Sequence, residues 1–330
     1  MADLLHLAAT PHIHSGSSTS SIMRDVLISL LPATVAGVVI FGWRALLVIA
    51  VCVVSCVLLE ALYNLITKKD QTVGDLSAAV TGLLLALNLP ANVPLWQCVV
   101  GSLFAIILVK CLFGGIGCNL VNPAITARVF MLVSFGSMAI PAMPTIVDTV
   151  SSATPLAQIA EGETPNLFKL FLGTTGGAIG ETCALALLIG FAYLLIRRII
   201  SWQIPVTFVG TVFLLSFFME GVTAIQALES APSIGLLIGV IFTATIRALA
   251  LVLSGGLLIG AIFMATDYVT SPPTPWGKVV FGVGAGLLTF LIRYFGIYPE
   301  GVSFAILLMN ILNPYIVKLT AHKIFGGVKA

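Results

Sequence analysis

Residues 44–66 read RALLVIAVCVVSCVLLEALYNLI, an almost unbroken apolar stretch with one acidic residue, Glu60, near its end. A helix needs about 20 such residues to cross the hydrocarbon core of a bilayer. Similar stretches recur along the 330-residue chain, which is 59% hydrophobic and only 8% charged. Soluble domains carry about 25% charged residues. The chain is therefore predicted to be an all-α polytopic membrane protein, which excludes soluble enzymes, disordered chains and secreted disulfide scaffolds.

Eleven apolar runs are candidates for membrane helices. They fall at 25–41, 44–66, 76–89, 95–113, 119–137, 178–196, 203–219, 234–252, 254–270, 277–294 and 301–317. The run at 76–89 is short and ends at Asn88-Leu89-Pro90, which favours a broken helix. Arg247 interrupts the run at 234–252, so we expect that run to be re-entrant or interfacial. About ten transmembrane helices remain.

Basic residues in short connecting segments predict the orientation, because they gather on the cytoplasmic side of a membrane. Lys68-Lys69, Arg197-Arg198 and the lysines of the tail mark the inside. The acidic loop 138–176 is expected outside, and the first 23 residues lack the features of a signal peptide. We predict cytoplasmic segments at 1–23 and 319–330, membrane repeats at 24–137 and 177–318, and an extracytoplasmic loop at 138–176.

The two halves of the chain share a pattern of helix-breaking residues. Asn88-Leu89-Pro90, Phe113-Gly114 and Asn122-Pro123 in the first half resemble Ser271-Pro272-Pro273, Phe295-Gly296 and Asn313-Pro314 in the second. Five spans in each half give the second copy the opposite orientation. The pattern therefore predicts two inverted five-helix repeats with broken helices, as in many transporters. The alternative is that these prolines and their neighbours are ordinary residues of span ends.

Six ionisable residues lie within or beside the apolar runs: Glu60, Asp75, Glu181, Arg247, Asp267 and Arg293. Burial of such groups in a membrane is costly, so each is a functional candidate. Asp267 follows a glycine-rich run and precedes a proline-rich segment, and it is our candidate for an ion path. Glu60 and Arg293 are expected near span ends, where long side chains reach water. A helix cap or an ion pair between the halves is the simpler interpretation for all six.

Metal and nucleic-acid sites are not expected. The six cysteines form no CxxC pair, and a buried free cysteine behaves as a small hydrophobic residue. All four histidines lie near the termini, which excludes a bis-histidine haem site inside the membrane. The net charge of +2 is too small to imply a nucleic-acid partner.

The outer loop contains Asp148-Thr149-Val150-Ser151-Ser152-Ala153-Thr154, which by itself predicts only a turn. Further motifs are Leu83-Leu84-Leu85-Ala86-Leu87, Gly114-Gly115-Ile116-Gly117-Cys118-Asn119-Leu120-Val121-Asn122-Pro123 and Met264-Ala265-Thr266-Asp267-Tyr268. With these motifs the chain resembles the D subunits of the Rnf ion-translocating electron-transport complexes. It is more distantly similar to the B subunits of the Na⁺-pumping NADH:quinone reductases. The resemblance extends over essentially the whole chain.

The resemblance implies a covalent FMN, linked through a phosphoester between the flavin phosphate and Thr154. Asp148 and Ser151 are then the residues that a Mg²⁺-dependent flavin transferase recognises. The family often has glycine where this chain has Thr149, a change that keeps the loop small and polar. A threonine hydroxyl on an exposed loop can be esterified, and the covalent link retains a flavin that otherwise diffuses away outside the cell.

A second, non-covalent flavin, riboflavin, is also implied by the resemblance. The breaks at Asn122-Pro123 and Asn313-Pro314 offer free backbone groups among the spans, so Asn122 and Asn313 are candidates for binding it.

The implied function is that of a flavin-carrying membrane subunit of an ion-translocating ferredoxin:NAD⁺ oxidoreductase in a bacterial or archaeal inner membrane. The chain has no Rossmann fingerprint and no cysteine cluster for iron–sulfur centres. It therefore holds no complete active site. Other Rnf subunits, including an FMN-bearing subunit on the outer face, must supply those parts, with membrane lipid around the spans.

A secondary transporter or channel for a small polar solute is the alternative function. It explains the inverted repeat and the broken helices. It does not explain the Ser-Ser-Ala-Thr loop that ends at Thr154. The sequence leaves open whether Na⁺ or H⁺ is the transported ion.

Overall fold

The computed structural model describes residues 18–145, 154–226, 234–296 and 301–321. These residues form helices and no strand, with a single isolated bridge between Ala142 and Gly177. In chain order the first half contains α1 (Thr19–Phe41), α2 (Trp43–Thr67), η1 (Val73–Asp75), α3 (Ser77–Leu87), α4 (Leu95–Leu103), the π-helix η2 (Phe104–Cys111) and α5 (Pro123–Ser134). The all-α class predicted from the sequence is thus confirmed for the described part of the chain.

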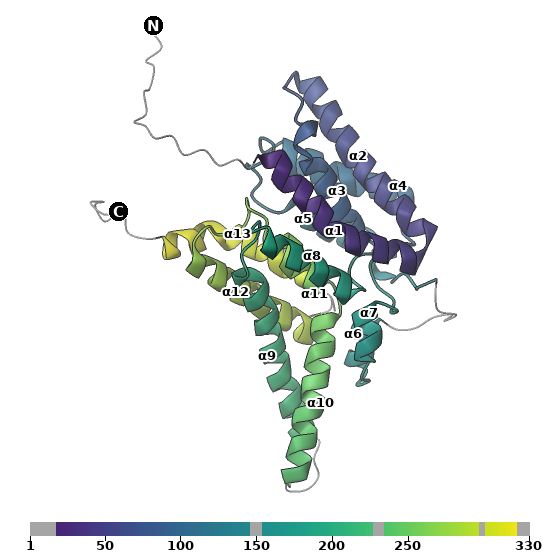
Figure 1. The fold of residues 1–330 in the computed structure, drawn as a ribbon, viewed down its shortest axis with the longest axis vertical. Coiled ribbons are helices and arrows are strands. Elements are labelled where there is room, and N and C mark those ends of the chain that lie inside the picture. Colours follow the sequence, from purple (N-terminus) through teal and green to yellow (C-terminus); the bar gives the residue numbers. More distant parts are fainter. Residues whose placement is uncertain (1–17, 146–153, 227–233, 297–300, 322–330) are drawn as a thin grey trace, which may run out of the picture.

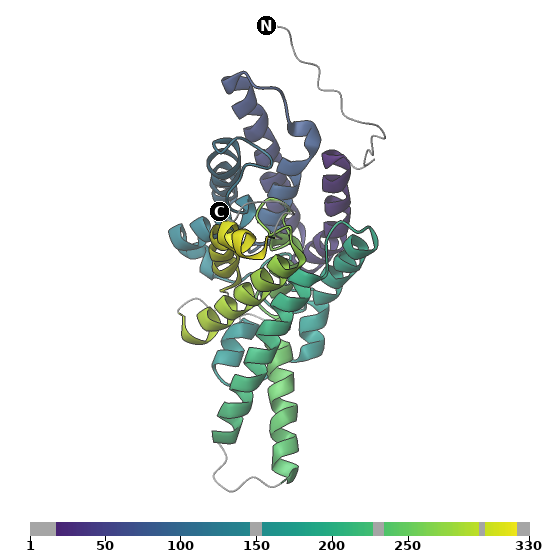
Figure 2. The ribbon, with the colours of Figure 1, turned by 90° about the vertical axis from the view of Figure 1, so that its left-hand side faces the viewer.

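The segment between the two halves and the second half continue the helical order. They contain η3 (Gly136–Ala139), α6 (Pro155–Ala160), α7 (Leu167–Leu172), α8 (Ala184–Ile196), α9 (Gln203–Gln226), α10 (Ile234–Leu253), α11 (Leu257–Ile259), the π-helix η4 (Gly260–Met264), α12 (Pro275–Phe295) and α13 (Val302–Thr320). Figures 1 and 2 both show α9 and α10 side by side, as a hairpin that projects beyond the other helices.

Five helices within the described ranges are long and apolar enough to cross a membrane: α1, α2, α9, α12 and α13. A sixth is counted if Leu237–Leu253 and Leu257–Met264, which are bent by 62°, form one span. The runs predicted at 234–252 and 254–270 are thus the two arms of one bent unit. Four further predicted runs contain the shorter apolar helices α3, α4 with η2, α5 and α8. A multi-pass membrane protein is confirmed, whereas the count of ten and the inverted repeat stay predictions.

Glycine allows the helices to pack at short range. A Cβ atom on Gly190 of α8 would clash with the Ser29 carbonyl oxygen of α1, and one on Gly286 of α12 would lie 3.0 Å from the Phe208 carbonyl oxygen of α9. Membrane helices associate through such small residues, because lipid tails compete equally well for apolar side chains. Substituting either glycine with a larger residue would push the helices apart.

One end of the molecule collects most of the exposed basic side chains. Contacts across this end join Arg197 to Asp25 (3.0 Å), Lys278 to Ser201 (2.9 Å), Thr274 to Thr320 (2.8 Å) and Ser20 to the Gly74 carbonyl (3.1 Å). They bring together the first turns of α1, α9 and α12 and the last turns of α8 and α13. We call this end, with its exposed Lys68, Lys69, Arg197, Arg198 and Lys318, the basic end.

The segment that ends at Thr145 lies at the opposite end. The backbone N–H and the hydroxyl of Thr145 donate to the Ile40 carbonyl, at 2.9 and 3.0 Å, beside the α1–α2 turn at Gly42. The 25 residues of α2 separate this turn from Lys68 at the basic end. At about 1.5 Å per residue, that helix is long enough to span a bilayer. We call this opposite end the loop end.

Candidate functional site

Thr154 begins α6 and is half-buried. Its Oγ1 accepts a hydrogen bond of 3.2 Å from the backbone N–H of Ala157, as expected for an N-cap threonine. Pro155 at the first helical position favours the same start, because its fixed φ suits a helix and it has no N–H to satisfy. Ser151 and Asp148, the predicted recognition residues, lie outside the described residues.

Two adjoining hollows of about 130 and 50 Å³ open beside Thr154. Both are lined by Thr154, Leu132, Met138 and Glu181, and together we call them the Thr154 cavity. Their remaining walls combine apolar side chains with polar ones, including Leu156, Leu170, Leu253, Thr175, Thr182, Asn88 and Arg128. Pockets for ring-shaped cofactors have this mixture, with apolar groups for the faces of the ring and a few polar groups for its edge. The Thr154 cavity therefore suits a flavin ring chemically.

A polar cluster forms one wall of the Thr154 cavity. Arg128 on α5 donates through Nη1 to Asn88 Oδ1 at 2.6 Å, and its Nη2 lies 3.7 Å from Glu181 Oε2. The Arg128 and Glu181 side chains are only 7% and 9% exposed. Asn88 is held in turn by a 2.7 Å bond from its Nδ2 to the Leu84 carbonyl, at the end of α3. The cluster thus places an oriented guanidinium and a carboxylate beside the threonine.

The break between α10 and α11 lies against the same cavity. Gly255 and Gly256 both have φ of +66°, a conformation that glycine adopts without strain. Arg293 donates to the carbonyls of Leu251, Ser254 and Gly255, at 2.6, 2.9 and 3.0 Å. A cation there satisfies the carbonyls left free where α10 ends and complements the helix dipole. Arg293 thus acts as the cap that was the simpler interpretation of this residue.

The segment that follows Thr154 is fixed to α10. Leu156 and Ile159 of α6 pack with Leu170, Ala250 and Leu251 in a small apolar cluster. Arg247 also donates to the Gly162 carbonyl while forming a 2.9 Å ion pair with Glu220. Arg247 thus lies within a continuous α10 and does not interrupt it. These contacts hold the start of α6 against the cavity.

A second cavity, of about 110 Å³, lies toward the basic end, and we call it the Asp267 cavity. Its polar lining residues are Ser77, Thr81, Lys110, Asn119, Asn122, Thr266, Asp267 and Tyr268. The Asp267 carboxylate accepts a hydrogen bond of 3.1 Å from the Thr270 hydroxyl. A carboxyl in this setting can exchange a proton or bind a cation.

Asn122 and Asn313 have different settings, although the sequence suggests equivalent breaks. Asn122 caps α5: its Oδ1 accepts from the N–H groups of Ala124 and Ile125, at 3.0 and 3.3 Å. Asn313 and Pro314 lie inside the continuous helix α13. The break predicted at Asn313-Pro314 is therefore wrong, and Asn313 lines neither cavity. Of the two candidates, Asn122 lines the Asp267 cavity.

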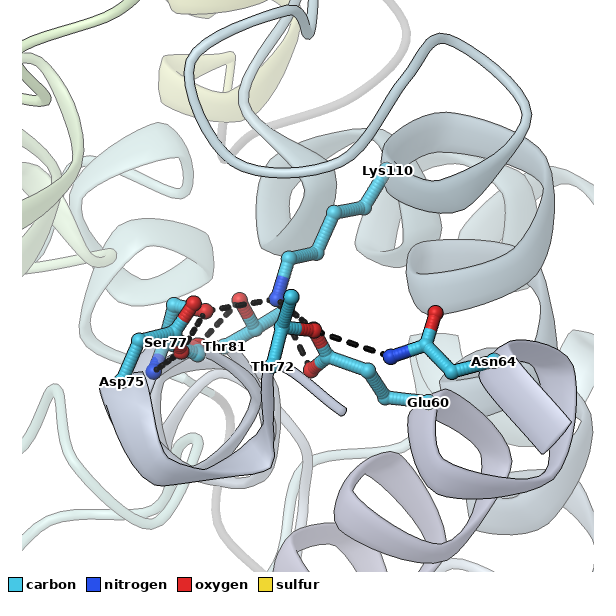
Figure 3. Close-up of polar contacts among 7 residues, drawn as sticks. All are labelled: Glu60, Asn64, Thr72, Asp75, Ser77, Thr81 and Lys110. Carbon is cyan, nitrogen blue, oxygen red and sulfur yellow. Dashed lines mark hydrogen bonds and ion pairs between the residues drawn. The ribbon is translucent and has the colours of Figure 1, made fainter. Parts of the chain in front are cut away.

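A buried ion pair lies beside the Asp267 cavity (Figure 3). Lys110 Nζ is 2.9 Å from both carboxylate oxygens of Glu60 and 2.6 Å from Ser77 Oγ. The Thr72 hydroxyl donates to Glu60 Oε1 at 2.7 Å, and Asn64 donates to Thr72 at 3.0 Å. The Lys110 and Glu60 side chains are 4% and 3% exposed. The expectation that Glu60 reaches water is therefore wrong. Its carboxylate instead joins a buried network between α2, η2 and the start of α3.

Met264 contacts one lining residue of each cavity. Its carbonyl accepts a 3.2 Å hydrogen bond from Asn122 Nδ2, and its sulfur lies 3.5 Å from Asn88 Nδ2. Asn122 lines the Asp267 cavity, and Asn88 lines the Thr154 cavity. A single residue at the end of η4 thus contacts side chains from both cavities.

The sequence interpretation missed two buried cations. Arg128 and Lys110 lie inside the apolar runs at 119–137 and 95–113, and neither was among the six charged candidates. A basic residue inside a predicted span is itself a signal, because its burial in a membrane requires a partner. Applied to every run, that signal identifies both residues, although it does not identify Glu181 and Glu60 as their partners.

Residues 6–326 match the NQR2, RnfD, RnfE family. The D subunit of the Na⁺-translocating ferredoxin:NAD⁺ oxidoreductase complex of Acetobacterium woodii is 44% identical over 331 residues, which cover 98% of this chain and 96% of that protein. The D subunit of the proton-translocating ferredoxin:NAD⁺ oxidoreductase complex of Clostridium ljungdahlii is 39% identical, covering 98% and 97%. The D subunit of the ion-translocating oxidoreductase complex of Escherichia coli K12 is 34% identical, covering 99% of each chain.

Proposed function

The chain belongs to the NQR2, RnfD, RnfE family, and on that premise we propose that it is a flavin-carrying membrane subunit of an ion-translocating ferredoxin:NAD⁺ oxidoreductase complex. Two relatives that are 44% and 39% identical over nearly the full length carry this activity in their names. The partners of this chain are then the other Rnf subunits, which hold the sites for NAD⁺ and ferredoxin.

The position of Thr154 at the edge of a mixed apolar and polar cavity is the observation that carries the flavin assignment. In this proposal a Mg²⁺-dependent flavin transferase joins Thr154 Oγ1 to the phosphorus of FMN. FAD supplies the FMN, AMP leaves, and the hydroxyl proton is released. Asp148 and Ser151 are the residues that the transferase recognises. No histidine or nucleophilic triad is needed in the chain itself, because the transferase performs the chemistry.

The bound FMN supplies the electron transfer, and the chain supplies its environment. Leu132, Met138 and Leu156 would hold the ring and exclude water, and Arg128 and Asn88 would supply polar contacts to it. The N-cap position of Thr154 fixes the point of attachment relative to this cavity. The contacts of α6 with α10 keep the attachment point from moving away.

Riboflavin is the proposed occupant of the Asp267 cavity, with Asn122 at its wall. An Asn122→Ala chain loses the cap of α5 and one side chain that faces this cavity, so it is expected to bind less non-covalent flavin. The measurement is the flavin released by acid per chain, with gel fluorescence reporting the covalent flavin separately. Asn313→Ala is the matched control, since Asn313 lies on α13 away from both cavities. Equal release from all three chains would place riboflavin elsewhere.

Asp267 is the proposed contact for the transported ion, because it is a carboxyl group at a cavity near the basic end. In the assembled complex, Asp267→Asn is expected to lower redox-driven ion uptake by about tenfold or more while the assembly stays intact. Uptake of ²²Na⁺ and of protons into proteoliposomes measures the effect for both ions. Asp70→Asn, an exposed change at the same end, is the control. Normal uptake by the Asp267 variant would remove this residue from the path.

The basic end is proposed to face the cytoplasm of a bacterial or archaeal cell, with both termini on that side. The loop end then faces outward, where an FMN-bearing partner subunit can exchange electrons with the flavin on Thr154. A cysteine placed at position 70 should react with a membrane-impermeant thiol reagent only in inverted vesicles. The native Cys118 is exposed, so it is first replaced by alanine.

A further inference from the structure

Arg128 is a costly residue for its position. Its side chain is 7% exposed, on a helix of an apolar run, and burial of a guanidinium at membrane depth is unfavourable. A guanidinium offers five N–H donors in a fixed plane. Such a group is retained where a planar acceptor or a negative charge must be recognised.

Asn88 holds the Arg128 guanidinium in one orientation. Asn88 caps α3 through its own Nδ2, which donates to the Leu84 carbonyl at 2.7 Å. That bond leaves Asn88 Oδ1 directed at Arg128, so the asparagine orients the arginine rather than the reverse. Arg128 also lines the hollow that Thr154 shares. Its guanidinium therefore stands at the cavity wall as an oriented cation.

Glu181 keeps the net charge of this wall near neutral. Its Oε2 lies 3.7 Å from Arg128 Nη2, which is longer than a charge-assisted hydrogen bond. The carboxylate faces both hollows of the Thr154 cavity. A flavin in the cavity is therefore exposed to two opposite charges, and removing one leaves the other uncompensated in a medium of low dielectric constant.

We infer that Arg128 sets the redox potential of the flavin carried by Thr154, by stabilising the negative charge that the ring gains on reduction, and that Glu181 opposes this effect. The inference rests on the proposed function, because it requires FMN on Thr154. Reduction by two electrons with uptake of one proton leaves one negative charge on the ring. A cation beside the ring stabilises that reduced form and raises the potential, and a carboxylate lowers it.

The test uses the full chain purified in detergent and titrated with dithionite while its visible absorbance is recorded. A Thr154→Ala chain gives the background, so that the difference reports the covalent flavin alone. Arg128→Gln is expected to lower the midpoint potential and Glu181→Gln to raise it. Each substitution should change the equilibrium constant for flavin reduction by about tenfold or more. For a two-electron couple, a tenfold change corresponds to a shift of about 30 mV in the midpoint potential.

Three further variants separate charge from structure. Arg128→Lys keeps the charge, so its midpoint potential should lie close to that of the wild-type chain. The midpoint potential of the double variant Arg128→Gln/Glu181→Gln should lie between those of the two single variants. Arg197→Gln removes a similar charge at the basic end and should leave the potential unchanged. Loss of structure alone would not produce shifts of opposite sign. If Arg128→Gln does not fold, the other two variants still test the inference. It then requires a raised midpoint potential in Glu181→Gln and a nearly unchanged one in Arg128→Lys.

The failures of the inference and of the proposed function are distinguishable. Covalent flavin with the same potential in every variant would overturn the inference and leave the function intact. Shifts of equal sign in Arg128→Gln and Glu181→Gln would also overturn it. A wild-type chain without covalent flavin would overturn the proposed function and, with it, the inference.

Discussion

A Thr154→Ala chain is expected to show no flavin fluorescence in a denaturing gel, whereas the wild-type chain shows a fluorescent band at its own mass. The reason is chemical: alanine offers no hydroxyl oxygen for the phosphoester. The expected effect is complete loss of the covalent flavin and of the electron transfer that depends on it. In-gel fluorescence under ultraviolet light measures the first, and ferredoxin-dependent NAD⁺ reduction by the assembled complex measures the second.

Thr175→Ala is the matched control for this experiment. Thr175 lines the same cavity as Thr154 but does not begin α6 and has no place in the attachment motif. Its variant should keep the fluorescent band at the wild-type intensity. Fluorescence that persists in Thr154→Ala would move the attachment to another residue, and loss of fluorescence in both variants would indicate a folding defect.

Lys110→Met is expected to destabilise the protein by about 3–5 kcal/mol, because it leaves the Glu60 carboxylate buried without its cation. Both oxygens of Glu60 are 2.9 Å from Lys110 Nζ, and the pair is almost fully buried. The measurement is the midpoint of thermal unfolding in detergent, together with the yield of folded chain. A large loss of yield would be the first sign, since marginal membrane proteins are degraded when they misfold.

Glu60→Gln/Lys110→Met tests the cause of that loss. Removing both charges leaves no uncompensated ion, so the double variant should recover a large part of the stability. Arg197→Gln breaks a more exposed pair, in which Arg197 is 52% exposed, and should cost much less. A double variant as unstable as Lys110→Met would show that packing around Lys110, rather than charge, determines the effect.

The membrane helices could be predicted from the sequence because their signal is local. An apolar run of about 20 residues is sufficient for a helix in lipid, where every backbone group must be satisfied within the segment. The structure accordingly has helices in each predicted run. The bent unit of α10 and α11 was less predictable, since Arg247 looked like an interruption until its partner Glu220 on α9 was known. Residues far apart in the sequence supply that partner.

The polar sites could be predicted only in part. Breaks were expected at both Asn122-Pro123 and Asn313-Pro314. The helix α5 starts at Pro123, whereas α13 continues through Pro314, because a proline inside a span is tolerated when neighbours satisfy the freed backbone groups. The pairs formed by Lys110 with Glu60 and by Arg128 with Glu181 join residues 50 and 53 positions apart. No periodicity encodes such pairs. The loop threonine, by contrast, depends on a resemblance and not on any physical signal in its own composition.

The mass of the intact wild-type chain tests the central claim most directly. The chain should carry one added FMN less one water, and fragmentation should place the addition on the peptide that contains Thr154. A purified sample should also stay yellow after acid precipitation, which a transporter or channel without flavin would not. An intact mass equal to that of the bare sequence, from a chain produced together with its flavin transferase, would contradict the proposed function.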